Sequence, residues 1–237
     1  MKKNQLFLTA LVSLFSISGF VSCKKDATPT KPDCKIVGVA AAGNAISFTY
    51  NADGKLSSKN SSTGTDRLTY NGNTITITTT TGTQVSTIKT VTLNVNGLAS
   101  KVSTNDGAGT HLSDIVYEYN GTELSKETVT TSAGDTFITT HTFSGGNMIT
   151  SQSDANITTL NYSNNIPAQT GDLWSFSNLQ QGYETIRTKN ALTSIESPGS
   201  ASISTINYVF DADGKITSLN NISNGVLFTF SYQYECK

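Results

Sequence analysis

A short unit that joins an aromatic residue to an Asn-Gly or Asp-Gly pair recurs along this chain of 237 residues. Residues 50–56 read Tyr-Asn-Ala-Asp-Gly-Lys-Leu, and residues 210–216 read Phe-Asp-Ala-Asp-Gly-Lys-Ile. Looser copies of the unit begin at Tyr70, Val95, Tyr119 and Phe143. A spacing of roughly 20 to 25 residues fits two strands and two turns, and the Gly pairs supply the positive φ of tight hairpin turns. The repeat therefore predicts hairpins in series.

Apolar and polar residues alternate on both sides of these turns, which is typical of strands with one buried face. The alternation appears in Ile46-Phe48-Tyr50, in Ile115-Tyr117-Tyr119 and in Val226-Phe228-Phe230-Tyr232-Tyr234. The chain is also rich in Thr, Asn and Gly, which favour strands and turns. The predicted fold class is all-β: a large antiparallel meander of about a dozen strands, strongly curved or barrel-like, because a sheet of that size curls, splits or closes.

One stretch, an insert near 164–192, lacks the turn motif. Within it Asp172 can cap a short helix that carries Leu173, Phe176 and Leu179 along one face. We therefore expect one short helical insert that plugs or covers one end of a barrel, or that packs beneath the sheet.

The same insert supplies the candidate ligand contacts. It holds the single tryptophan of the chain, Trp174, together with Phe176, Tyr183 and Arg187. Exposed aromatic side chains offer stacking and hydrogen-bonding area to a glycan, a peptide or a protein partner. Apolar residues at helical spacing also serve simple packing, so a plug or core role for these residues is the alternative.

The N-terminus resembles a secretory signal. Lys2 and Lys3 precede a mostly apolar run from Leu6 to Val21, which is too short for a comfortable transmembrane helix. Phe20-Val21-Ser22-Cys23 resembles a bacterial lipobox, in which the Cys23 thiol is acylated and becomes the new N-terminus. An ordinary signal peptide with a chance cysteine is the alternative interpretation.

These features predict three segments. Residues 1–22 form a lipoprotein signal peptide, 23–33 a polar, proline-containing tether, and 34–237 a single β-meander domain. Acyl chains on Cys23 would anchor the protein to the bilayer surface. Removal of the signal peptide takes two lysines with it and shifts the formal net charge from -1 to -3. This mildly acidic balance argues against electrostatic binding to nucleic acid or to anionic lipid.

Two further cysteines, Cys34 and Cys236, stand at the two ends of the predicted domain. In an oxidising compartment such a pair favours a disulfide that places the first and last strands side by side. Two free thiols are the alternative.

The lipobox, the tether, Cys34, the unit at 50–56 with its copy at Phe210, and Lys189-Asn-Ala-Leu192 carry a resemblance over most of the predicted domain. The chain resembles Bacteroidetes envelope lipoproteins of a domain-of-unknown-function family with a porin-like, curved antiparallel sheet. The hairpin unit is also similar to the Tyr-Asp repeats of large bacterial surface proteins. The resemblance implies a fold and an envelope location, but no reaction and no catalytic residue.

Motifs that carry catalytic or metal chemistry are missing from the sequence. His111 and His141 do not form a ligand-spaced pair, so we expect no metal site. Asp211-Ala-Asp213-Gly214 resembles the start of a calcium loop, but Ile222 occupies the position that requires an acid. We find neither a nucleophile elbow nor a phosphate-binding glycine loop, and therefore expect no cofactor and no enzyme activity.

Three classes of function remain. The first is a lipid-anchored envelope protein of the binding or scaffolding kind, on the outer membrane, with a glycan or protein ligand and no nucleic-acid partner. The second is a carbohydrate-active hydrolase, which needs two carboxylates in one cleft. The third is a conducting outer-membrane barrel, which needs an apolar outer band that Thr-rich strands such as 74–81 do not supply.

Overall fold

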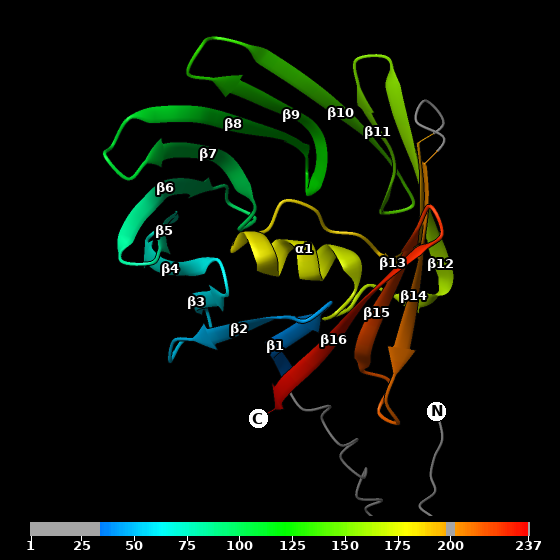
Figure 1. Ribbon diagram of the computed structural model, residues 1–237. Coiled ribbons are helices and arrows are strands. Elements are labelled where there is room, and N and C mark those ends of the chain that lie inside the picture. The colour runs from blue at the N-terminus through cyan, green and yellow to red at the C-terminus, as the bar shows by residue number, and fades with distance from the viewer. Residues whose placement is uncertain (1–33, 198–201, 237) are drawn as a thin grey trace, which may run out of the picture. The chain divides into compact units, whose positions relative to one another are not determined.

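The chain forms an antiparallel β-barrel that is closed and holds one short helix in its interior (Figure 1). The computed structural model describes residues 34–197 and 202–236. The predicted signal peptide, the tether and Cys23 lie outside these described residues. The strands are β1 (Cys34–Ala41), β2 (Asn44–Tyr50), β3 (Leu56–Ser61), β4 (Gly64–Asn71), β5 (Thr74–Thr81), β6 (Gln84–Leu93), β7 (Ala99–Asp106), β8 (His111–Asn120), β9 (Glu123–Thr131), β10 (Thr136–Ser144), β11 (Asn147–Ser153), β12 (Asn156–Pro167), β13 (Asn190–Ser197), β14 (Ser202–Phe210), β15 (Ile216–Ser223) and β16 (Val226–Cys236); the helix α1 spans Leu173–Gln181.

The predicted fold class is confirmed, with sixteen strands among the described residues rather than about a dozen. The additional strands escaped the sequence pattern because they carry polar residues on both faces, as β3 does with Leu-Ser-Ser-Lys-Asn-Ser. Each strand pairs with its neighbours in the sequence, and β1 pairs with β16 to close the ring. No helix in the described part of the chain is long and apolar enough to cross a membrane.

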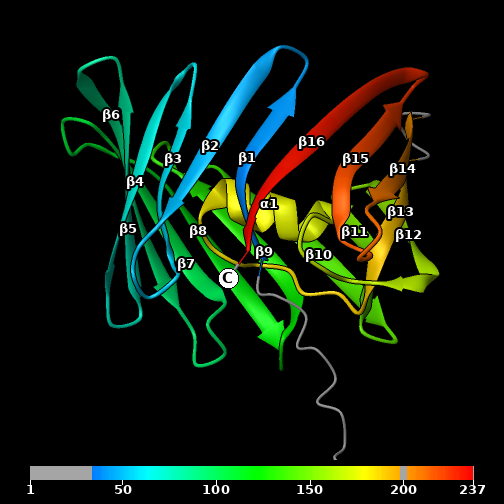
Figure 2. The same ribbon diagram turned by 90° about the horizontal axis from the view of Figure 1, so that it is seen from below.

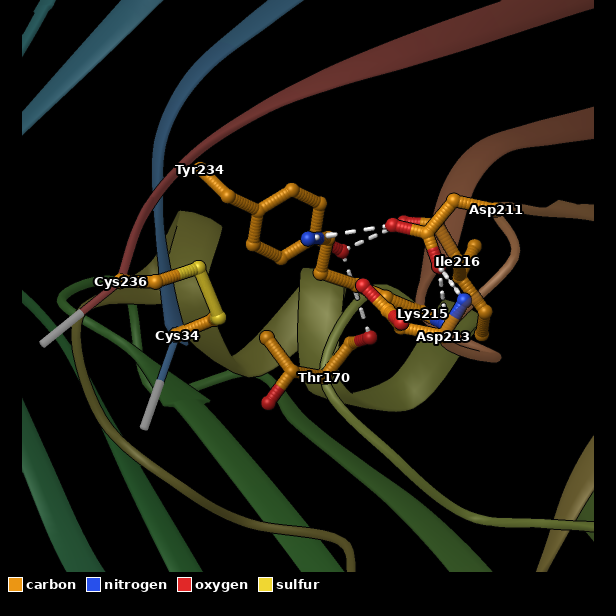
Figure 3. The surroundings of a disulfide bond; sticks show 8 residues. All are labelled: Cys34, Thr170, Asp211, Asp213, Lys215, Ile216, Tyr234 and Cys236. Carbon is orange, nitrogen blue, oxygen red and sulfur yellow. Dashed lines mark hydrogen bonds and ion pairs between the residues drawn. A yellow bond between two sulfur atoms is a disulfide. The ribbon is translucent and has the colours of Figure 1, made fainter. Parts of the chain in front are cut away.

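A disulfide between Cys34 and Cys236 lies at the closing ladder, where the two residues are register partners (Figure 3). It joins positions 202 residues apart in the sequence. The bond therefore ties together the strands that only barrel closure brings into contact.

The repeated turns adopt the geometry that the sequence predicts. Gly54 and Gly214 have φ values of +77° and +76°, a conformation in which a side chain would be strained. The Asp211 carboxylate accepts hydrogen bonds from the backbone N–H groups of Asp213 and Lys215, at 3.0 and 2.9 Å. Turn formation therefore accounts for Asp211 of this unit.

The hydrophobic core lies inside the barrel. On β5, Ile75 and Ile77 are buried, whereas the intervening threonines face outward. Farther around the barrel, the outer face of β8 and β9 carries the ion pair Lys126–Glu118, with 2.6 Å between Nζ and Oε1. On β5 the alternation thus separates an apolar inner face from a polar outer face.

The helix α1 lies in the barrel interior in both views (Figures 1 and 2). The Asp172 carboxylate caps it by accepting from the Ser175 N–H at 2.8 Å, and Gly182 ends it with φ +82°. Phe176, only 5% exposed, packs against Phe230 and Tyr232 of β16, with ring centroids 5.3 and 5.6 Å apart. Of the placements predicted for the insert, the structure shows the plug.

Contacts from opposite sides of the barrel hold the plug in place. Lys59 of β3 donates a hydrogen bond to the carbonyl of Gln180 at the helix C-terminus, at 2.8 Å. The segment that follows the helix makes two further contacts. Its Glu184 carbonyl accepts from the Ala99 N–H of β7 at 2.8 Å, and its Lys189 N–H donates to the Gly146 carbonyl at 2.9 Å. The insert therefore crosses the interior instead of covering a rim.

Tyrosines close gaps in the wall at one end of the barrel, which we call the tyrosine end. It contains the turns at 51–55 and 211–215 and the disulfide; the opposite end is called the far end. The β3–β4 ladder joins Ser58–Ser61 to Gly64–Arg67 and stops before Leu56 and Tyr70. The Tyr70 hydroxyl donates instead to the Leu56 carbonyl at 2.8 Å, with Lys55 Nζ 5.0 Å from the ring centroid.

The same contact recurs around the ring. Hydroxyl-to-carbonyl hydrogen bonds of 2.6–2.7 Å join Tyr50 to Ile36, Tyr119 to Ala99, Tyr208 to Leu192 and Tyr234 to Ile216. Figure 3 shows the last of these beside the disulfide. On β6 the corresponding residue is Leu93, and there the β5–β6 ladder stays paired down to Thr74 and Thr92. Tyr50, Tyr70 and Tyr119, aromatic residues of the sequence repeat, thus mark places where paired strands diverge, and Tyr208 and Tyr234 make the same contact outside the repeat.

Candidate functional site

The four ligand contacts predicted from the insert do not form one site. Trp174 and Arg187 line a pocket of about 230 Å³ beside α1, with Asp172 and Glu184 among its other walls. Trp174 Nε1 donates to the Tyr162 hydroxyl at 3.2 Å, and Arg187 pairs with Glu184 at 2.6 Å. Both polar groups therefore already have partners within the protein.

The other two predicted residues lie away from that pocket. Phe176 belongs to the core, as described above. Tyr183 forms a side-chain hydrogen bond with Tyr117 of β8, and burial raises the pKa of both hydroxyls. The structure thus gives the packing role to Phe176 and places Tyr183 against the inner wall.

A second pocket of about 510 Å³ lies where β1 and β2 diverge at the tyrosine end. Its lining includes Lys35, Phe48, Tyr50, Asp53 and Glu235. Lys35 Nζ donates to the Gly54 carbonyl at 3.0 Å and lies 5.3 Å from the Tyr50 ring centroid. Its cation is therefore engaged in holding the two strands together.

The inner wall changes character towards the far end. Phe228 lies on the same face of β16 as Phe230, which packs on the plug, yet Phe228 is 45% exposed. Phe137 of β10 is paired with Val129 of β9 and is 56% exposed. Inward-facing aromatic rings with this much exposed area show that solvent reaches the inner wall at the far end.

Glu127 of β9 lies on this inner wall, and sequence analysis missed it. Its register partners are Tyr117 on β8 and Thr139 on β10, and Tyr117 is a buried core residue, so all three point inward. Burial raises the pKa of the Glu127 carboxyl. Within the described part of the chain, the carboxylate has neither an ion pair nor a hydrogen bond to protein.

His141 of β10 lies on the same face, two residues beyond Thr139. Both of its ring nitrogens are buried and have no hydrogen-bond partner among the described residues. Burial lowers the pKa of the imidazole, which favours the neutral ring at pH 7. A buried polar group with no protein partner indicates a place for a water molecule or a ligand.

We call Tyr117, Glu127, Thr139, His141 and Tyr183 the inner-wall cluster. Its members come from β8, β9, β10 and the segment after α1, and the solvent-exposed Phe137 adjoins it. The cluster combines one carboxyl, one neutral imidazole, three hydroxyls and aromatic rings. No group of three or more metal-ligating side chains occurs in residues 34–197 and 202–236. The cluster can therefore bind through hydrogen bonds, charge and ring faces.

The comparisons with known proteins identify the class of fold. The chain is similar to the crystal structure of a porin-like protein from Bacteroides uniformis, with a TM-score of 0.62 and 18% identity over 84% of this chain and 96% of that one. It is also similar to a porin-like protein from Bacteroides vulgatus, with a TM-score of 0.52 and 16% identity over 84% and 97% of the two chains. Neither a scan against family models nor a search of curated proteins finds a match. The chain thus has the porin-like barrel fold of these two proteins.

Proposed function

We propose that this chain is a lipid-anchored protein of the bacterial envelope, a water-facing binding barrel rather than a channel or an enzyme. The observation that carries the proposal is the division of the inner wall. The tyrosine end is sealed by apolar packing and by the plug, whereas solvent reaches Phe137 and Phe228 farther along the wall, where Glu127 and the His141 ring have no protein partner among the described residues.

The outer surface of the barrel supports a water-facing role. A barrel that spans a bilayer carries a tall apolar band on its outer face and polar residues inside. Here the outer face carries threonines on β5 and the ion pairs Lys126–Glu118 and Lys101–Asp114. Exposed aliphatic side chains also face outward on the adjacent strands β14, β15 and β16, at Ile203, Ile222 and Leu227. This patch does not form a band around the barrel, because β5 and β7–β9 carry the threonines and ion pairs.

The plug also supports a binding barrel rather than a conducting channel. Conduction needs a continuous aqueous path, and α1 crosses the interior with Phe176 packed into the core. The N-terminal lipobox at Cys23 supplies the anchor in this proposal, and the Lys24 that follows favours the outer membrane. A chain that begins at residue 34 is expected to be soluble without detergent. A detergent requirement would favour the conducting barrel.

A carbohydrate-active hydrolase is the second candidate, since the raised pKa of Glu127 suits a general acid. Glycoside hydrolysis needs a second carboxylate about 5–9.5 Å away. The inward positions flanking Glu127 on β8 and β10 hold Tyr117, Tyr119, Thr139 and His141. Glu184, in the segment after α1, pairs with Arg187. Binding without reaction therefore fits the cluster better.

The binding proposal is tested with two neighbouring substitutions. Phe137 and Ile138 are adjacent on β10, similarly exposed at 56% and 47%, and on opposite faces of the wall. Calorimetric titration with a panel of soluble glycans and peptides should find a ligand whose affinity falls in Phe137→Ala and is unchanged in Ile138→Ala. A ligand that responds only to Ile138→Ala would move the site to the outer face.

A further inference from the structure

No positively charged side chain of the neighbouring strands faces Glu127 on the inner wall. Lys126, the next residue on β9, points outward and pairs with Glu118 at 2.6 Å. The inward residues that flank Glu127 are Tyr117 and Thr139, neither of which carries a positive charge. An ionised carboxylate that is partly buried without a counter-charge is costly. The wall therefore presents an acid whose positive partner does not come from the neighbouring strands.

The cations that share the inner wall are committed elsewhere or lie on distant strands. Lys59 contacts Asp66 at 2.6 Å and the Gln180 carbonyl at 2.8 Å. Arg187 contacts Glu184 at 2.6 Å. Lys89 of β6 faces Ile77 and Thr104, and two strands separate β6 from β9.

The titratable side chains that share the inner-wall cluster with Glu127 are neutral at pH 7. Burial raises the pKa of the Tyr117 and Tyr183 hydroxyls, so they stay protonated, and burial lowers the pKa of His141. A neutral imidazole keeps one acceptor nitrogen and does not repel a positive ligand. The aromatic faces of Tyr117 and Tyr183 attract cations through their ring quadrupoles.

We propose that the inner-wall cluster binds an organic ammonium group, with the Glu127 carboxylate as its counter-ion and the surrounding aromatic rings as its walls. The Thr139 hydroxyl, opposite Glu127 on β10, offers a further acceptor. The exposed ring of Phe137 then contacts the apolar part of the ligand. This inference rests on the proposed binding function and names the ligand class of the same site.

The test compares two probes of nearly equal shape. Benzylamine is cationic at pH 7, whereas benzyl alcohol is neutral. Binding to the full chain, purified in detergent, is followed by saturation-transfer NMR with each probe. Benzylamine is expected to bind at least about tenfold more tightly than benzyl alcohol, because only the amine neutralises the carboxylate. Added salt should weaken amine binding only moderately, since the site is partly shielded.

Two substitutions assign the effect to Glu127. Glu127→Gln should abolish the preference for the amine, and Glu127→Asp should keep it because the charge remains. Glu118→Gln, on the outer face of the adjacent strand β8, is the matched control and should leave both probes unchanged. A melting curve of each variant verifies that the barrel is folded.

Equal binding of the two probes, or an amine preference that survives in folded Glu127→Gln, would overturn the inference. A different set of results would contradict the proposed binding function. If neither probe binds while a neutral glycan binds in a Phe137-dependent manner, the ammonium class is wrong and the binding site stands. If glycans, peptides and both probes all fail to bind the inner wall, both proposals are wrong.

Discussion

The two ends of the barrel use the same strands for different purposes. At the tyrosine end, inward residues such as Leu192 and Leu219 are fully buried, and hydroxyl groups satisfy the carbonyls of diverging strands. Towards the far end, the same faces carry Glu127 without a cation and Phe228 nearly half exposed. The comparison teaches that one end can supply the stability that leaves the rest of the inner wall free to carry an unpaired carboxylate and solvent-exposed rings.

Removing the disulfide should lower the free energy of unfolding more than any other change, because the bond constrains the tyrosine end as a whole. The double change of Cys34 and Cys236 to Ser releases a loop of about 200 residues, worth on the order of 5 kcal/mol in the chain-entropy model. Urea unfolding with and without reductant measures the loss. A wild-type barrel equally stable in both conditions would show that closure does not depend on the bond.

Truncating one core residue and one far-end residue contrasts the two ends directly. Leu219→Ala on β15 removes a fully buried side chain and should cost about 2–5 kcal/mol. Phe228→Ala on β16, a larger deletion, should cost less than about 1 kcal/mol because the ring is already 45% exposed. Chemical denaturation of both variants provides the measurement. Similar losses would mean that the far end contributes to the core as much as the tyrosine end.

The tyrosine contacts should contribute individually modest amounts. Tyr70→Phe deletes the hydroxyl that donates to the Leu56 carbonyl and should lower the free energy of unfolding by about 1 kcal/mol. Tyr232→Phe is the control, since that buried hydroxyl has no partner and its loss should be neutral or stabilising. If both changes gave the same result in denaturation experiments, the hydroxyl contacts would not be what holds the diverging strands.

The smallest effect should be a change in how the free energy of unfolding depends on pH when Glu127 is replaced. Burial raises the pKa of Glu127 above its ordinary value of 4.5, so the folded state holds the proton more tightly than the unfolded state. Stability therefore falls as pH rises from the unfolded pKa through the folded one. The free energy of unfolding of Glu127→Gln relative to wild type should increase over that window and then level off. A difference that is flat with pH would contradict the burial of this carboxyl.

The local features of the fold were predictable from the sequence. Asp-Gly turns fix their own backbone geometry, and Asp172 marks the helix start by a hydrogen bond three residues away. The plug position was one of several expected placements, because the contact between Lys59 and Gln180 joins residues 121 positions apart. Only the closed barrel decides between those placements.

The inner-wall cluster was not predictable in the same way. Strands β9 and β10 carry Thr, Ser and charged residues on both faces, so no period of two distinguishes inward from outward positions. The register shift between Glu118 and Tyr119 also changes which residues of β9 face inward. Glu127 could be found only once the pairing with Tyr117 was known.

The order of the strands has a consequence for how the molecule assembles. Every ladder but one joins strands that follow each other in the chain, and β1–β16 alone joins its two extremes. Short loops have a small entropic cost of closure, so hairpins can form one after another as the polypeptide emerges. The β1–β16 ladder closes the longest loop and therefore has the largest entropic cost. We expect the ring to shut last, with thiol oxidation following rather than guiding that step.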